Sequence, residues 1–347
     1  MKILVIGGTR FIGKAVAAHA SSNGHEVVLF NRGQAQPKSP YETVNGDVDR
    51  LCEYKTALRQ LNADVVIHCI AYTEQHAMDT ADVFGESKTR LIVLSSQDCY
   101  EAFFQLNRGR DIAELPMAED SPTCRTKYYW RDVPNAKTNP DYDKNLLTAC
   151  ALAVHREGRL RTGVLRLPMV FGPEDFQFRH RHGKIIRRIF DRQPRLVLGA
   201  VEQSSLFTFG FIDNVAAAIV HASEVSVTDG KVFNIGEAKS RSLHRWAELY
   251  AEAADIEFEF KVLPDALVEQ DTLAINIPPR LLQFDTQAFR METGFSEPVP
   301  LNEQIRRTLS WGLEHSNALG PKPDYEGESR ISESYAGYIS GALKEGT

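Results

Sequence analysis

Residues 1–30, MKILVIGGTRFIGKAVAAHASSNGHEVVLF, decide the fold of this chain. Lys2–Ile6 is an apolar run that ends in two glycines, which is typical of a strand buried on both faces of a parallel sheet. A helical spacing of apolar residues follows and stops at Asn23-Gly24, and Glu26–Phe30 is again strand-like. The stretch therefore predicts a complete βαβ unit.

The same alternation continues along the chain. Strand-like runs return at 65–69, 91–94 and 163–167, and helix-compatible segments occupy 48–61, 73–87 and 141–157. Alternating strands and helices predict an α/β protein with a doubly wound parallel sheet. Because 347 residues exceed the usual limit of one hydrophobic core, we also expect a smaller, mostly C-terminal lobe.

We draw the domain boundaries where the sequence changes character. The expected division assigns residues 1–171, with 207–236 returning, to the main domain, 172–206 and 237–315 to the smaller lobe, and 316–347 to a loosely held tail.

Composition limits the function classes. No apolar run approaches the roughly 18 residues that cross a bilayer, so we expect no membrane span. The five cysteines are widely spread and form no metal-type spacing, which predicts reduced thiols, a cytoplasmic protein and no metal site.

A net charge of −6 does not favour nucleic acid as a partner, but residues 179–195 are strongly basic. That stretch is either an amphipathic helix with a solvated basic face, with Ile185, Ile186, Ile189 and Phe190 as its buried stripe, or a site for a polyanion. We expect His180 and His182 in it to be solvated.

The turn between the first strand and the first helix predicts a cofactor site. It reads Gly7-Gly8-Thr9-Arg10-Phe11-Ile12-Gly13. Glycines let the backbone approach a pyrophosphate, and the free N–H groups of a helix N-terminus bind it. Since a strand precedes this turn and a helix and second strand follow it, we expect a Rossmann-type dinucleotide site. Its expected contacts are Gly7, Thr9, Arg10, Phe11, Ile12 and Gly13.

The end of the second strand favours NADP as cofactor over the alternative, NAD. An acid at this place would bind the ribose 2′-hydroxyl of NAD, but the chain has Asn31-Arg32-Gly33. Arg10 replaces a glycine usual in the motif, and a guanidinium suits a phosphate. We expect Arg10, Asn31 and Arg32 to accommodate a 2′-phosphate, unless Arg10 simply forms a surface salt bridge.

Six motifs in order resemble those of the extended short-chain dehydrogenase/reductases, in the NAD-dependent epimerase/dehydratase family, over roughly residues 1–236. Besides GGTRFIG, the six are GDV at 46–48, DVVIHCIA at 64–71, LSSQDCY at 94–100, RLPMVFGP at 166–173, FIDNV at 211–215 and FNIG at 233–236. The GGTRFIG and NRG variants are also similar to a subgroup related to chloroplast stem-loop-binding proteins. The resemblance adds Asp47, Val48, Ile70, Ala71, Lys144 and Pro168 as cofactor contacts, and it implies a homodimer.

The resemblance also implies catalytic roles for Ser96, Tyr142 and Lys144. In the family a hydroxyl orients the substrate, a tyrosine exchanges the proton, and a lysine lowers the pKa of that tyrosine and holds the nicotinamide ribose. The tyrosine and lysine are normally four residues apart, but Tyr142 and Lys144 are two apart and Pro140 stands four before the lysine. If the helix starts at Pro140, with Asn139 as its cap, the pair is separated. If it starts later, Tyr142 lies in extended chain and reaches the site.

These observations favour an NAD(P)-dependent epimerase, dehydratase or reductase that transfers a hydride to and from a sugar-like or other small hydroxylated substrate. Thr208, Phe209 and Gly210 stand where a family arginine binds the diphosphate of nucleotide sugars, which disfavours such substrates unless Arg179, Arg187 or Arg195 replaces the charge. Aromatic residues at 128–130, in the irregular insertion 107–140, either close over the nicotinamide, supply another phenol or pack the lobe. The alternative is a catalytically weakened protein that binds cofactor as a structural or sensing ligand and associates with RNA through 179–195.

Overall fold

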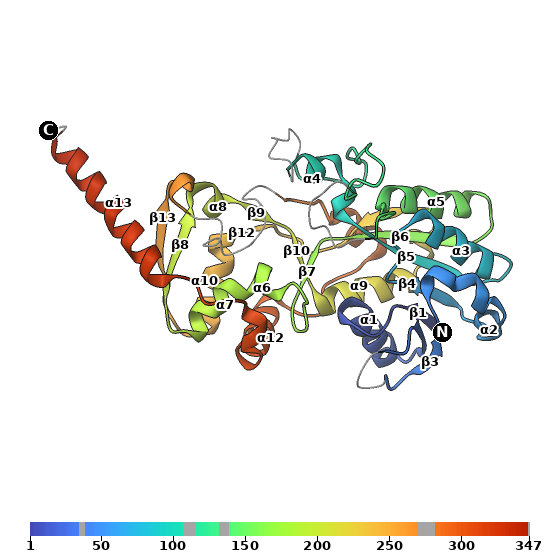
Figure 1. Cartoon of the computed structure of the whole chain (residues 1–347). Coiled ribbons are helices and arrows are strands. Elements are labelled where there is room, and N and C mark those ends of the chain that lie inside the picture. Colours follow the sequence, from blue (N-terminus) through green and yellow to red (C-terminus); the bar gives the residue numbers. More distant parts are fainter. Residues whose placement is uncertain (35–38, 107–114, 132–138, 269–281, 346–347) are drawn as a thin grey trace. The chain divides into compact units, whose positions relative to one another are not determined.

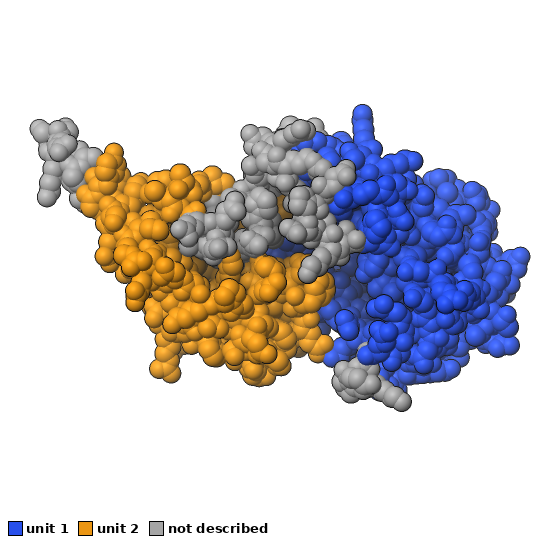
Figure 2. All heavy atoms as spheres, viewed as in Figure 1, with its two compact units in different colours: residues 1–170, 209–238, 284–299 blue, residues 171–208, 239–283, 300–347 orange. Residues whose placement is uncertain are grey.

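The computed structural model describes residues 1–34, 39–106, 115–131, 139–268 and 282–345. Its chain divides into two compact units, coloured separately in Figure 2. Unit 1 comprises Met1–Val170, Phe209–Ala238 and Phe284–Val299, and unit 2 comprises Phe171–Thr208, Lys239–Gln283 and Pro300–Thr347. The segment Phe284–Val299, which the sequence division places in the smaller lobe, thus belongs to unit 1.

Unit 1 contains a seven-stranded parallel sheet in the order β3-β2-β1-β4-β5-β6-β11, so the fold class expected from the sequence is confirmed. Figure 1 labels its elements. The strands are β1 (Lys2–Ile6), β2 (Glu26–Asn31), β3 (Glu42–Asn45), β4 (Val65–His68), β5 (Arg90–Ser96), β6 (Arg161–Leu167) and β11 (Val232–Asn234), with the short pair β7 (Met169–Phe171) and β10 (Phe209–Phe211) beside them. The helices are α1 (Phe11–Ser22), η1 (Val48–Tyr54), α2 (Lys55–Gln60), α3 (Glu74–Phe84), η2 (Gln97–Cys99), α4 (Glu101–Leu106), α5 (Lys144–Arg156), α9 (Ile212–Glu224), η3 (Ser226–Thr228) and α11 (Gln287–Thr293).

Alternate residues of the strands supply the two faces of the sheet. Leu4, Val28, Val66 and their equivalents pack into one hydrophobic cluster with residues of α2, α3 and α5. The intervening residues of β1, β2, β4, β5 and β6 are equally buried, and α1 and α9 pack against each other. Burial on both faces explains the continuous apolar runs in the sequence. The strand order reverses between β1 and β4, which is where open α/β sheets bind ligands at the carboxyl ends of their strands.

Unit 2 is smaller and mixed. Its elements are α6 (Phe178–Arg181), α7 (Gly183–Phe190), β8 (Arg195–Gly199), α8 (Ala200–Ser204), β9 (Leu206–Phe207), β12 (Arg241–Ser242), α10 (Leu243–Ala253), β13 (Glu259–Leu263), η4 (Asp265–Leu267), α12 (Leu301–Glu314), η6 (Ser316–Leu319) and α13 (Tyr325–Glu345). The segment expected as a loose tail therefore contains the long helix α13, coloured red in Figure 1. No described helix is both long and apolar enough to cross a membrane.

The basic stretch 179–195 is engaged within unit 2. Four of its arginines form ion pairs with acids of the same unit: Arg181 with Asp175, Arg187 with Asp191, Arg188 with Glu328 and Arg195 with Glu259. Most of its cationic charge is thus already compensated.

Two details of that stretch differ from the expectation. Phe190 is 44% exposed, so the buried stripe ends before it. His182 is not solvated, because it is fully buried against Phe171 and Trp246 and its Nδ1 lies 2.9 Å from the Tyr250 hydroxyl. Burial lowers the pKa of His182 to about 3.

Candidate functional site

The turn at the start of α1 has the close-packed backbone that a pyrophosphate requires. Gly7 adopts φ +88°, a left-handed conformation that favours glycine, and its N–H donates to the Phe30 carbonyl at 3.0 Å. A Cβ on Gly13 would lie 2.1 Å from the Gly7 carbonyl oxygen. Arg10, the residue before α1, forms no side-chain cap hydrogen bond, and the first turn of α1 contains no acidic residue that would repel a phosphate. The residues present fit a dinucleotide.

The end of β2 carries polar groups without partners. The Oδ1 of Asn31 accepts a hydrogen bond from Gly33 N–H at 2.8 Å, while its Nδ2 is buried and has no partner. Arg10 and Arg32 are exposed, and neither forms a recorded ion pair within the described part of the chain. Asp47 caps η1 by accepting from Asp49 N–H at 3.2 Å, and Val48 begins η1.

Contacts after β4 connect this turn to Lys144. A Cβ on Gly7 would lie 2.7 Å from the Ile70 side chain, so Ile70 covers the turn. The next residue, Ala71, accepts a hydrogen bond from Lys144 Nζ through its carbonyl, and the Leu94 carbonyl accepts a second at 2.9 Å. An ammonium carries three N–H donors, so one remains for a ligand. Pro168, also expected at the site, follows β6 and packs near Gly210.

The start of α5 decides between the two alternatives for Tyr142. Asp143 is the cap, because its carboxylate accepts from the N–H groups of Asn145 and Leu146 at 2.9 and 3.0 Å. The helix therefore starts after Tyr142, whose own N–H donates to the Asn139 carbonyl in a preceding turn. Lys144 is the first helical residue, and its Nζ lies 5.6 Å from the centre of the Tyr142 ring.

The phenol of Tyr142 is directed at a carboxylate rather than at the lysine. It donates to Asp98 Oδ2 at 2.9 Å. Burial raises the pKa of Tyr142 well above its ordinary value, and the charge of Asp98 raises it further, while a hydrogen bond with Ser96 acts in the opposite direction. Burial also lowers the pKa of Lys144 to about 8. Ser96, Tyr142 and Lys144 are thus brought together, but not as a phenolate paired with an ammonium.

The insertion supplies further donors to this site. Tyr129 and Trp130 donate to Asp98 at 3.1 and 3.2 Å, which is a role that the sequence did not assign to them. Asp98 itself was missed, although it follows the carboxyl end of β5 two residues after Ser96, where a functional side chain is expected. The flanking segments 107–114 and 132–138 lie outside the described residues.

Two histidines near Lys144 were also not anticipated. His68 ends β4, is buried, and has no hydrogen-bond partner on either ring nitrogen among the residues that the structure describes. Its ring stacks on that of His76 with centroids 5.9 Å apart. The Nδ1 of His76 accepts from Tyr72 N–H at 3.0 Å, so its Nε2 donates to Asp49 at 2.8 Å. Burial and the charge of Lys144 lower the pKa of His68.

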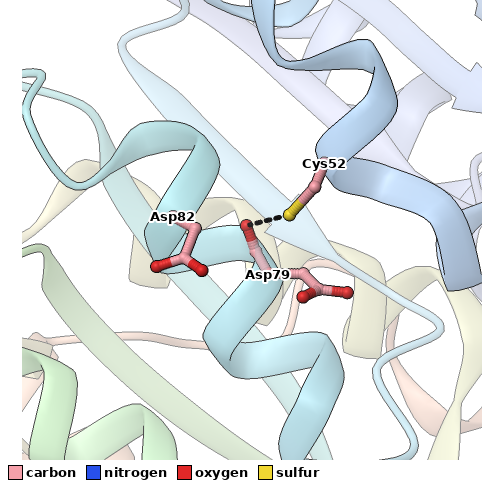
Figure 3. Close-up of side chains that lie close together, drawn as sticks. All are labelled: Cys52, Asp79 and Asp82. Atoms are coloured by element: carbon pink, nitrogen blue, oxygen red, sulfur yellow. Dashed lines mark hydrogen bonds between the residues drawn. The ribbon is translucent and has the colours of Figure 1, made fainter.

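One group of potential metal ligands lies elsewhere in unit 1. Cys52, Asp79 and Asp82 approach one another on η1 and α3, with ligand atoms within 4.8 Å (Figure 3). Cys52 and Asp82 are exposed and Asp79 is half-buried; Asp82 pairs with Arg159 at 2.6 Å, and Asp79 accepts from Gln75 at 2.7 Å. The two carboxylates therefore already interact with side chains of the same unit.

Sequence comparison matches residues 3–236 to the NAD dependent epimerase/dehydratase family. The chain belongs to this family. No curated protein matches it in a sequence search. Among solved structures, it is similar to UDP-glucose 4-epimerase of Stenotrophomonas maltophila with bound NAD (TM-score 0.68, 15% identity, 92% of this chain and 99% of that one). It is also similar to dTDP-glucose 4,6-dehydratase of Bacillus anthracis in complex with NAD (TM-score 0.65, 13% identity, 91% of this chain and 98% of that one). At these identities the likeness shows the fold, and family membership supplies the link to NAD-type cofactors.

Proposed function

We propose that the protein is an NAD(P)-dependent epimerase, dehydratase or reductase acting on a sugar-like or other small hydroxylated substrate. One observation carries the proposal: consecutive contacts through Ile70 and Ala71 connect the glycine turn to Lys144, beside Ser96 and Tyr142. When bound, the nicotinamide supplies a hydride acceptor or donor. Lys144 offers its remaining N–H to the ribose, and Ser96 and Tyr142 orient the substrate hydroxyl.

We further propose a small substrate without a nucleoside diphosphate. Thr208 and Phe209 are buried, and Gly210 packs against Val215 and Pro168, so this segment presents no cation. Of the three replacements considered from the sequence, Arg187 and Arg195 are already paired with acids, and the exposed Arg179 donates from its Nε to His180 Nε2 at 2.8 Å. The substrate thus differs in charge from the nucleotide sugars named for the similar structures.

We favour NADP as the cofactor because Arg10 in the glycine turn and Arg32 at the end of β2 are exposed cations, and the Nδ2 of Asn31, next to Arg32, has no partner among the described residues. The internal ion pairs of 179–195 do not support the alternative of an RNA-associated protein related to the stem-loop-binding subgroup. Salt-dependent RNA retention by the intact chain, lost on charge reversal in 179–195, would restore that alternative.

The first prediction concerns cofactor choice. NADP is expected to raise the Tm of the protein more than NAD does, because a ligand bound only by the native state stabilises it. Combined R10A and R32A substitutions are expected to weaken NADP binding roughly 100-fold or more while sparing NAD binding, since each charge-assisted hydrogen bond contributes about 1.5–3 kcal/mol and about 1.4 kcal/mol corresponds to a tenfold change. Thermal shift and calorimetry measure both.

The matched control is R306A, which removes an exposed arginine of α12 and is expected to change neither affinity. No shift with NAD, NADP, NADH or NADPH would contradict the proposed function. An equal loss of affinity for NAD and for NADP in the double variant would contradict only the proposed preference for NADP.

A further inference from the structure

Asp98 is a carboxylate surrounded by neutral donors. It lies in η2, just after β5, and its N–H donates to Ser96 Oγ at 3.2 Å. Oδ2 accepts from the Tyr142 hydroxyl at 2.9 Å and from Trp130 Nε1 at 3.2 Å, and Oδ1 accepts from the Tyr129 hydroxyl at 3.1 Å. Within the described residues, no lysine or arginine forms a salt bridge with it. Three donors therefore fix the orientation of a carboxylate that no cation neutralises by direct contact.

This arrangement keeps Tyr142 protonated. A phenolate would place a second negative charge at hydrogen-bond distance from Asp98 Oδ2. Lys144 Nζ, 5.6 Å from the centre of the Tyr142 ring, donates to the carbonyls of Ala71 and Leu94 and forms no hydrogen bond with the phenol among the described residues. Burial and Asp98 both raise the pKa of Tyr142. Tyr142 is thus held as a donor, not as a ready proton acceptor.

We propose that Asp98 is the final acceptor of the substrate proton, with Tyr142 as the relay between them. The inference rests on the function proposed above, written in the direction of alcohol oxidation. The substrate O–H bond breaks and its proton bonds to Tyr142 Oη, while the original Tyr142 proton moves to Asp98 Oδ2. The substrate C–H bond breaks with its electron pair leaving as hydride, for which an oxidised nicotinamide held by the glycine turn and Lys144 would supply the acceptor. Tyr142 begins and ends neutral, Asp98 ends as a carboxylic acid, and the reverse direction returns both protons.

The other groups near the phenol come from several elements. Tyr72 after β4 and Tyr129 of the insertion place their ring centres 5.9 and 6.0 Å from that of Tyr142. Lys144 of α5 lies near the same ring, Ser96 ends β5, and the Cys99 thiol in η2 also raises the pKa of Tyr142. A titration must therefore isolate Tyr142 from Tyr72 and Tyr129.

Ultraviolet difference titration of the full chain provides that isolation without a substrate. The difference between the titration curves of the wild type and Y142F gives the ionisation of Tyr142 in the wild type. The difference between the curves of D98N and D98N/Y142F gives the ionisation of Tyr142 when the Asp98 carboxylate is absent. We expect no Tyr142 signal near neutral pH in the wild type. In D98N the midpoint is expected to fall by about one pH unit or more, because a neighbouring negative charge is removed. D98E, which retains the charge, is expected to restore wild-type behaviour.

Two results would overturn the inference: a wild-type Tyr142 that ionises near neutral pH, or a D98N variant whose Tyr142 signal appears no earlier than in the wild type. NAD and NADP binding by D98N and wild type is measured in parallel by thermal shift. Failure of the wild type to bind either dinucleotide would reject the proposed function, whereas normal binding with an unaltered Tyr142 titration would reject only the role of Asp98.

Discussion

At the scale of single residues, the buried Lys144 makes the stability of the protein depend on pH. Lys144 is 4% exposed, and burial lowers its pKa from 10.5 to about 8. Between these values the unfolded chain holds more protons than the folded one, so this lysine makes the free energy of unfolding rise with pH. Below about pH 8 both states are charged at this position and the full cost of burying the ammonium is present.

K144M is expected to abolish this contribution, so that the unfolding free energy of the variant rises less between pH 8 and about pH 10 than that of the wild type. Denaturant unfolding at the two pH values measures the difference. K88M, at an exposed lysine, is the control and should keep the wild-type slope. A K144M slope equal to that of the wild type would show that Lys144 is not held as described.

Sequence alone could predict the glycine turn at Gly7 and Gly13 because a strand precedes it and a helix follows it, whereas Lys144 was assigned only through the family resemblance. It could not place Tyr142, because both Asn139-Pro140 and Asp143 are helix-start signals within five residues. Asp143 forms the cap, and its carboxylate also accepts from the Tyr128 N–H at 2.9 Å, a contact across fifteen residues. The role proposed for Asp98 depends on hydrogen bonds from residues 129, 130 and 142. These residues are distant from it in sequence, so no local pattern indicates the contacts.

At the scale of elements, α7 and α13 are joined by a buried ion pair. Arg188 Nη2 and Glu328 Oε1 lie 2.6 Å apart, and each side chain is 3% exposed. E328A would leave the guanidinium buried with one partner fewer, and loss of one member of such a pair costs about 3 kcal/mol. We therefore expect a marked fall in the denaturant midpoint of unit 2.

The control is E303A in the exposed cluster with Arg306 and Arg307, which should change stability much less. Equal effects of E328A and E303A would contradict the view that this buried pair anchors α13.

The same helix shows why elements differ in predictability. The strands β1, β2, β4, β5 and β6 and the helices α1, α3 and α5 agree with the sequence prediction because their apolar spacing matches the faces they bury, whereas β3, which has no buried residue, was not predicted. α13 contains glycines and serines with low helix propensity. Its first turns are tied by Arg188, by Arg195 through Ser329, and by Asp191 through the Tyr325 hydroxyl. These contacts span more than 130 residues and leave no local signal.

At the scale of the whole molecule, the parallel sheet was predictable and the path of the chain between the units was not. Phe284–Val299 returns to unit 1 through hydrogen bonds of Asp285 N–H to the Met117 carbonyl and of Val299 N–H to Asn214. Both partners are distant in sequence, and the preceding segment 269–281 lies outside the described residues.

The central claim is that the glycine turn at the start of α1 binds a nicotinamide dinucleotide, and hydrogen–deuterium exchange of the full chain tests it most directly. With saturating NADP or NAD, amides of residues 7–13 are expected to exchange more slowly, since they gain a phosphate acceptor. Peptides from α13 should be unchanged. Unaltered exchange of residues 7–13 with both dinucleotides would contradict the account.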